Sequence, residues 1–282
     1  MKPARFAYAS PATVSEALYL LSEHEDARII AGGQSLVPMM NMRIAQPELL
    51  VDINRIDGLA GVHLDGDHLV IGTLTRHADL ATNELVRTHA PILAQAAGTI
   101  GHVAIRQRGT IGGSLSHADP AAQLPLIAML LDAQINAQSS AGARTIPTVE
   151  FFETLFTTTL EPGEMVVSIR VPVLPTDHGW GFGLFNRRAG DFAEVSCAAL
   201  RLGQGAETSM RLALGAVVSA PIRADDMLPD LDEASPNWAA EASRIVAAET
   251  PVEDNARMPE DYRREVLQAL VEDTLRDAMR RS

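Results

Sequence analysis

Two short glycine-rich turns, far apart in the sequence, constrain this chain more than any other feature. The first reads AGGQSL, from Ala31 to Leu36, and the second reads GTIGGS, from Gly109 to Ser114. Each follows an apolar or strand-like run. Because glycine has no Cβ, each turn is expected to provide a bend whose backbone N–H groups an anion can approach closely. Together the two bends predict a clamp for a diphosphate group.

The first turn is expected to join a buried strand, residues 27–31, to a helix. Ser35 is the predicted N-cap of that helix, and Pro38 is compatible with its first turn. Free N–H groups and the helix dipole attract phosphate at such a position. In the second turn, the hydroxyls of Thr110 and Ser114 add to the glycine amides. Neither turn matches the dinucleotide fingerprint or the phosphate loop with its lysine, which excludes Rossmann and P-loop folds.

Longer segments around both turns, residues 31–56 and 100–125, resemble the flavoprotein (medium) subunit of molybdenum hydroxylases, the xanthine dehydrogenase and carbon monoxide dehydrogenase family. Shorter similar stretches extend the resemblance over nearly the whole chain: residues 6–8, 151–152, 163–164 and 187–193. The resemblance implies that this chain binds FAD non-covalently, with the backbone and small side chains of both turns around the diphosphate. The residues implied are Ala31, Gly32, Gly33, Gln34, Ser35, Leu36, Thr110, Gly112, Gly113 and Ser114.

The resemblance also assigns three positions outside the turns. Ile100 aligns with an apolar or aromatic residue that lies against the flavin, and Val166 with a hydrophobic backbone contact. Either residue could instead belong to the core. Gln123 stands where many relatives carry an Asp or Glu that bonds the ribose, and its amide both donates and accepts hydrogen bonds.

A pair of arginines, Arg187 and Arg188, lies in a segment where relatives often place a basic residue near the flavin. A cation there would stabilise the anionic reduced flavin and raise its potential. Arg188 is the predicted contact. The alternative is that the two arginines form a surface pair with Asp191.

The order of expected elements predicts an α+β fold. By resemblance it is the two-subdomain FAD-binding fold of the vanillyl-alcohol oxidase type, followed by a small C-terminal α+β domain. We expect the units to span residues 1–56, 57–175 and 176–282, with the proline-rich stretch 171–179 as the second boundary. The third unit is expected to contain antiparallel strands followed by two amphipathic helices, at residues 238–248 and 260–279.

Composition excludes several classes of function. The net charge of −13 argues against a nucleic-acid surface, which needs clustered Lys and Arg. We expect a cytoplasmic protein, because the sequence shows neither an export signal nor an apolar run long enough to span a membrane. The single cysteine, Cys197, cannot hold an iron–sulfur cluster alone and is expected to pack inside a strand.

Other chemical motifs are weak. The stretch HEDAR at residues 24–28 has Arg where a zinc protease needs its second His, and no metal ligand or catalytic residue is assigned in this chain. His117 and Asp119 suggest acid–base chemistry, but Asp119 before Pro120 also suits a local turn. The two interpretations stay open at this point. No chemistry is assigned to the similar triplet at residues 77–79.

The resemblance implies a function in electron transfer. Electrons from a molybdopterin cofactor in a large subunit would cross iron–sulfur clusters in a small subunit, reach FAD here and pass to an external acceptor. The complex is expected to be a dimer of heterotrimers. Gln34, where carbon monoxide enzymes tend to have His, favours N-heterocyclic substrates. The alternatives are a self-contained flavin oxidoreductase of the same fold and a scaffold without cofactor, although the intact glycines argue against the scaffold.

Overall fold

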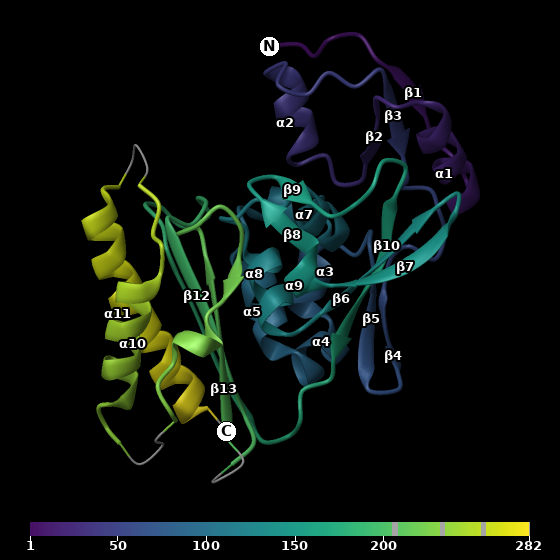
Figure 1. The fold of residues 1–282 in the computed structure, drawn as a ribbon. Helices are drawn as coiled ribbons and strands as arrows, with labels where there is room; N and C mark the ends of the chain where they lie inside the picture. Colours follow the sequence, from purple (N-terminus) through teal and green to yellow (C-terminus); the bar gives the residue numbers. More distant parts are fainter. Residues whose placement is uncertain (205–207, 232–234, 255–257, 282) are drawn as a thin grey trace.

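A computed structural model describes residues 1–204, 208–231, 235–254 and 258–281 (Figure 1). The N-terminal part is a parallel three-stranded sheet with the order β1-β3-β2. Helix α1 begins after Thr13, whose hydroxyl accepts a hydrogen bond from the Glu16 N–H, and buries Ala17 and Leu18 against this sheet. The elements are β1 (Ala7–Ala9), α1 (Val14–Glu23), β2 (Ala27–Ile30), α2 (Leu36–Asn41) and β3 (Leu49–Asp52).

The middle part is a five-stranded antiparallel sheet with the order β4-β5-β10-β6-β7, next to a group of helices. Its strands are β4 (Val62–Asp65), β5 (His68–Gly72), β6 (Gln134–Ser139), β7 (Gly142–Pro147) and β10 (Met165–Pro172), with a separate hairpin of β8 (Phe152–Thr154) and β9 (Thr157–Thr158). The helices are α3 (His77–Thr82), α4 (Glu84–His89), α5 (Pro91–Thr99), α6 (Val103–Arg106), α7 (Ile111–His117), α8 (Gln123–Leu130) and α9 (Thr148–Phe151).

The last part is an antiparallel four-stranded sheet between two layers of helices (Figure 1). Helices α10 and α11 cover one face, and α8 packs against the other. The elements are β11 (His178–Phe185), β12 (Val195–Leu202), β13 (Ser209–Gly215), β14 (Ile222–Arg223), the 3₁₀ turn η2 (Asp225–Met227), α10 (Trp238–Glu249) and α11 (Glu260–Arg280).

Strand β12 explains why this sheet has helices on both faces. Val195, Cys197 and Ala199 pack into the cluster under α10 and α11, whereas Ala198 and Leu200 pack into the cluster around α8. Successive side chains of a strand point to opposite faces, and here both faces are apolar. A sheet with this sequence must therefore be covered on both sides.

The predicted α+β class is confirmed, because helices and strands alternate along the described chain and the strands form separate sheets. The three larger sheets use residues 7–52, 62–172 and 178–223, and we propose unit boundaries near residues 56 and 175 between them. Within the described ranges, no helix is both long and apolar enough to cross a membrane.

Residues 77–89 form two short helices rather than one. Asn83, with φ −64° and ψ 130°, ends α3 and caps α4, and its side chain accepts a hydrogen bond from the Val86 N–H. Asparagine competes with helical hydrogen bonding in this way, which explains the break.

Cys197 is fully buried, and burial raises the pKa of its thiol to about 12. The predicted packing role is confirmed. Because the thiolate is the reactive form, we expect no modification of native protein by iodoacetamide at pH 8 and complete modification in denaturant. Mass spectrometry of both samples checks this, and rapid labelling of the native protein would contradict it.

Candidate functional site

The two glycine turns touch each other. A Cβ on Gly32 would lie 2.3 Å from the Arg108 carbonyl oxygen and 2.9 Å from the Gly109 Cα. Only glycine permits this approach of one backbone to another. The fold therefore places both halves of the predicted clamp side by side. We call the contact between Gly32 and residues 108–109 the seam.

The first turn presents a run of unpaired amides. Gly33 has φ +69°, in the left-handed region that favours glycine. Among the described residues, the backbone N–H groups from Gly32 to Leu36 have no acceptor. Ser35 precedes α2 as predicted, yet its hydroxyl makes no capping hydrogen bond. Consecutive free N–H groups of this kind suit the oxygens of a phosphate.

The second turn differs from the expectation of unobstructed amides. It is the first turn of α7, and Thr110, only 2% exposed, caps this helix by accepting a hydrogen bond from the Gly113 N–H at 3.1 Å. The Gly112 N–H donates to the Thr73 carbonyl at 3.0 Å, and the Ser114 N–H donates to the Thr110 carbonyl at 3.0 Å. These amides are therefore already paired within the protein.

The glycines of the second turn instead allow close packing. A Cβ on Gly112 would lie 1.7 Å from the Thr73 hydroxyl oxygen, so the helix start is pressed against the loop after β5. Gly113 is exposed and Ser114 half-buried, which leaves the surface of these two residues open beside the first turn. This turn can contribute shape and the Ser114 hydroxyl.

His77, to which sequence reasoning assigned no chemistry, fixes the second turn. Its backbone N–H donates to the Gly109 carbonyl, and its ring Nε2 lies 3.0 Å from the Thr110 carbonyl oxygen. A carbonyl only accepts, so Nε2 carries a proton, and the lowered pKa of the ring keeps it neutral at neutral pH. Burial lowers the pKa of His77 to about 4. The triplet at residues 77–79 did not reveal this role, because the partners of His77 lie about thirty positions away.

The three predicted positions outside the turns differ in exposure. Val166 is buried in β10, and its neighbour Val167 accepts a hydrogen bond from the Thr73 N–H at 3.1 Å, next to the second turn. Ile100 is half-buried at the end of α5. Gln123 is only 5% exposed, and its side-chain amide bonds to no other residue in the described part of the chain. The polar atoms of this amide keep access to solvent, and an accessible amide without a protein partner suits a ligand contact.

The arginine pair lies on an exposed loop after β11. Arg187 Nε is 3.9 Å from the Glu194 carboxylate. Asp191 contacts Arg188 through the backbone, because its N–H donates to the Arg188 carbonyl. A Cβ on Gly190 would lie 3.2 Å from the Gly101 carbonyl oxygen. The loop with Arg188 therefore sits beside the segment that follows Ile100.

His117 and Asp119 form no acid–base pair in the described structure. Asp119 accepts a hydrogen bond from the Ala121 N–H at 2.9 Å, which is the local turn contact, and the His117 ring stacks on Phe156 with centroids 4.9 Å apart. Burial lowers the pKa of His117 and raises the pKa of Asp119. The interpretation as a turn is the one these contacts support.

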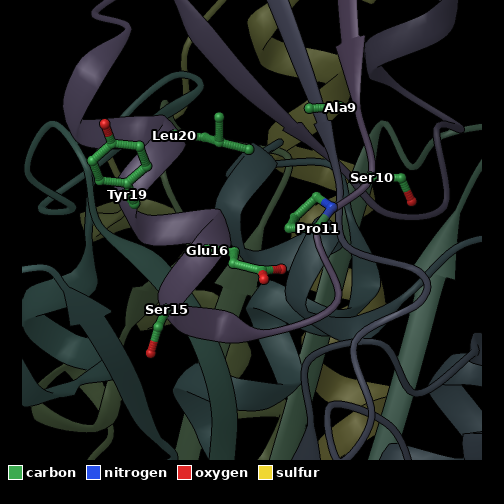
Figure 2. Close-up of a pocket in the computed structure, with 7 residues that line it drawn as sticks. All are labelled: Ala9, Ser10, Pro11, Ser15, Glu16, Tyr19 and Leu20. Carbon is green, nitrogen blue, oxygen red and sulfur yellow. The ribbon is translucent and has the colours of Figure 1, made fainter.

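A separate hollow of about 500 Å³ lies between the end of β1 and helix α1 (Figure 2). None of the predicted site residues borders it. Its lining consists of Ala9, Ser10, Pro11, Ser15, Glu16, Tyr19 and Leu20.

Comparison with known proteins identifies the chain over its full length. Residues 4–174 match the family described as the FAD binding domain in molybdopterin dehydrogenase, and residues 180–278 match the CO dehydrogenase flavoprotein C-terminal domain. The 6-hydroxypseudooxynicotine dehydrogenase complex subunit alpha of Paenarthrobacter nicotinovorans is 42% identical, over 100% of this chain and 97% of that protein.

Solved structures agree in fold. Carbon monoxide dehydrogenase from Hydrogenophaga pseudoflava superposes with a TM-score of 0.94 at 35% identity, covering 99% of this chain and 98% of the matched one. Quinoline 2-oxidoreductase from Pseudomonas putida 86 gives 0.92 at 33% identity, with coverage of 99% and 98%. With its FAD-binding and flavoprotein C-terminal domains, the chain belongs to the family of medium, FAD-carrying subunits of molybdenum hydroxylases such as carbon monoxide and xanthine dehydrogenases.

Proposed function

We propose that the seam between the two glycine turns holds the diphosphate of FAD. The run of free amides in the first turn carries this proposal, because five consecutive N–H donors without an acceptor fit an anion with several oxygens. The second turn supplies the exposed backbone of Gly113, which has no side chain in the way, and the Ser114 hydroxyl. The proposed diphosphate residues are Ala31, Gly32, Gly33, Gln34, Ser35, Leu36, Gly113 and Ser114, with the buried Thr110 and Gly112 shaping the second turn behind them.

Four further residues complete the proposed FAD site. Gln123 would bond the ribose through its unpartnered amide. Ile100 and Val166 would supply apolar and backbone contacts to the flavin. Arg188, exposed beside the Ile100 segment, would bring positive charge to the flavin edge and thereby favour the reduced form.

The chain is proposed to act as one electron carrier in a transfer route between subunits. FAD, when bound, supplies redox chemistry that connects one-electron and two-electron partners. Electrons from a molybdopterin cofactor on a large subunit would arrive through iron–sulfur clusters on a small subunit and leave to an external acceptor. Within the described ranges, the chain has one buried cysteine and no group of side chains that could hold a metal. Its own part is to bind the flavin and to keep it oriented.

N-heterocycle hydroxylation is the proposed overall reaction of the complex. The relatives named for quinoline and for 6-hydroxypseudooxynicotine support this substrate class, as does Gln34 in the first turn. We further propose that the chain assembles in a dimer of heterotrimers and is located in the cytoplasm.

Anaerobic stopped-flow absorbance tests the electron-transfer role against a self-contained oxidoreductase. We expect the isolated chain to be yellow, to release FAD on denaturation and to show no flavin reduction on mixing with quinoline or nicotine. Co-expression with the small and large subunits is expected to give substrate-dependent reduction. Rapid bleaching of the flavin band without partners would contradict the role and favour the alternative.

A further inference from the structure

Arg76, which lies outside both turns, forms hydrogen bonds with residues next to each turn. Arg76 lies at the N-terminus of α3, immediately before His77. Its Nη1 donates to the Arg108 carbonyl at 2.5 Å, and its Nη2 donates to the Asn54 side-chain oxygen at 2.7 Å. The Arg108 carbonyl is the same group that packs against Gly32.

Asn54 continues this connection to the first turn. Its side-chain nitrogen donates to the Ala31 carbonyl at 2.8 Å and to the Asp52 carboxylate at 2.6 Å. Asp52 ends β3 and is also bonded by the Tyr8 hydroxyl from β1. A continuous path of hydrogen bonds thus runs from the first turn through Asn54 and Arg76 to Arg108, the residue before the second turn.

Arg76 forms no close ion pair within the described part of the chain, although Asp79 and Asp52 lie near enough to stabilise its charge. Burial, and then repulsion by Arg108, lowers the pKa of Arg76. A guanidinium can donate to two acceptors in a fixed fork, whereas an ammonium cannot reproduce that planar geometry.

We propose that Arg76, linked through Asn54, is a positioning residue that fixes the two glycine turns relative to each other before the cofactor binds. This inference rests on the proposed diphosphate site. The first turn follows strand β2 and the second opens helix α7, and the two meet at a close backbone contact, so without a connecting group small motions would separate them. Holding the turns together in advance reduces the ordering cost of binding.

Variants of both residues test the role through ligand affinity. The apoprotein of each is titrated with FAD and with ADP, which shares the diphosphate and adenosine but lacks the flavin. We expect Arg76→Met and Asn54→Leu each to weaken both ligands about tenfold or more, since each breaks hydrogen bonds to a charged group. The double variant is expected to be little weaker than either single one, because both changes break the same path.

Two further measurements separate positioning from charge and from general stability. Arg76→Lys keeps the charge but not the fork, so we expect it to bind ADP nearly as weakly as Arg76→Met. Hydrogen exchange of the apoproteins should rise at the hydrogen-bonded amides of Val37 and residues 111–114 and stay unchanged in β12 and α11. The matched control is Arg87→Met: Arg87 is exposed on α4, its guanidinium donates to the Ala81 carbonyl, and the variant should leave affinity unchanged.

The outcomes are distinct. Wild-type ADP affinity in Arg76→Lys, or additive effects in the double variant, would overturn the positioning role and leave the diphosphate site standing. If wild-type apoprotein binds FAD but not ADP, the diphosphate site itself is wrong, and the inference fails with it.

Discussion

Gly32→Ala is expected to weaken FAD binding by about 10- to 100-fold. The new Cβ would lie 2.3 Å from the Arg108 carbonyl oxygen and 2.9 Å from the Gly109 Cα, so backbone must move on one side of the seam. Overpacking of this kind costs about 1–3 kcal/mol, and 1.4 kcal/mol corresponds to a factor of ten in affinity. Fluorescence titration of the apoprotein with FAD measures the change.

Gly98→Ala is the matched control. Gly98 lies in α5, where a Cβ would meet only the Ala81 Cβ at 3.9 Å, an ordinary contact. Alanine is the better helix former, so this variant should bind FAD normally and gain about 0.5–1 kcal/mol in free energy of unfolding. Equal FAD affinity for Gly32→Ala and Gly98→Ala would show that the diphosphate does not sit at this seam.

Acid is expected to lower the free energy of unfolding by about 3 kcal/mol through His77 alone. Its pKa falls from 6.5 in the unfolded chain to about 4 in the folded protein, chiefly because the ring is buried. The hydrogen bond to Thr110 opposes this shift, and repulsion by Arg76 and Arg106 adds to it. Between these two pH values the unfolded chain binds a proton that the folded protein does not. The contribution is therefore complete above pH 6.5 and is lost as the pH falls towards 4.

His77→Gln isolates this effect from other groups. Glutamine can still donate to the Thr110 carbonyl but does not titrate. Urea unfolding from pH 7.5 to 4 should show a steeper loss of stability for the wild-type protein than for the variant. His117, whose pKa is also lowered, and Asp119, whose pKa is raised, act on both proteins and cancel in the difference. Parallel curves would rule out His77 as the origin.

The sequence by itself determined the secondary structure of the last part and the location of the turns. Strand β12 follows from a short run of mostly apolar residues and helix α11 from the spacing of its apolar residues, and both signals depend only on neighbouring residues. The two glycine turns are likewise visible as short motifs, and the flavin-binding family could be recognised from them.

Only the tertiary structure decided how the turns are used. It showed that the Gly112 N–H donates to the Thr73 carbonyl and the Gly113 N–H to the Thr110 hydroxyl, whereas the N–H groups of the first turn stay free. It also brought Arg76 to the seam. These features depend on hydrogen bonds between segments that are distant in the sequence. Such contacts are set by how the sheets pack, and no local pattern of residues encodes them.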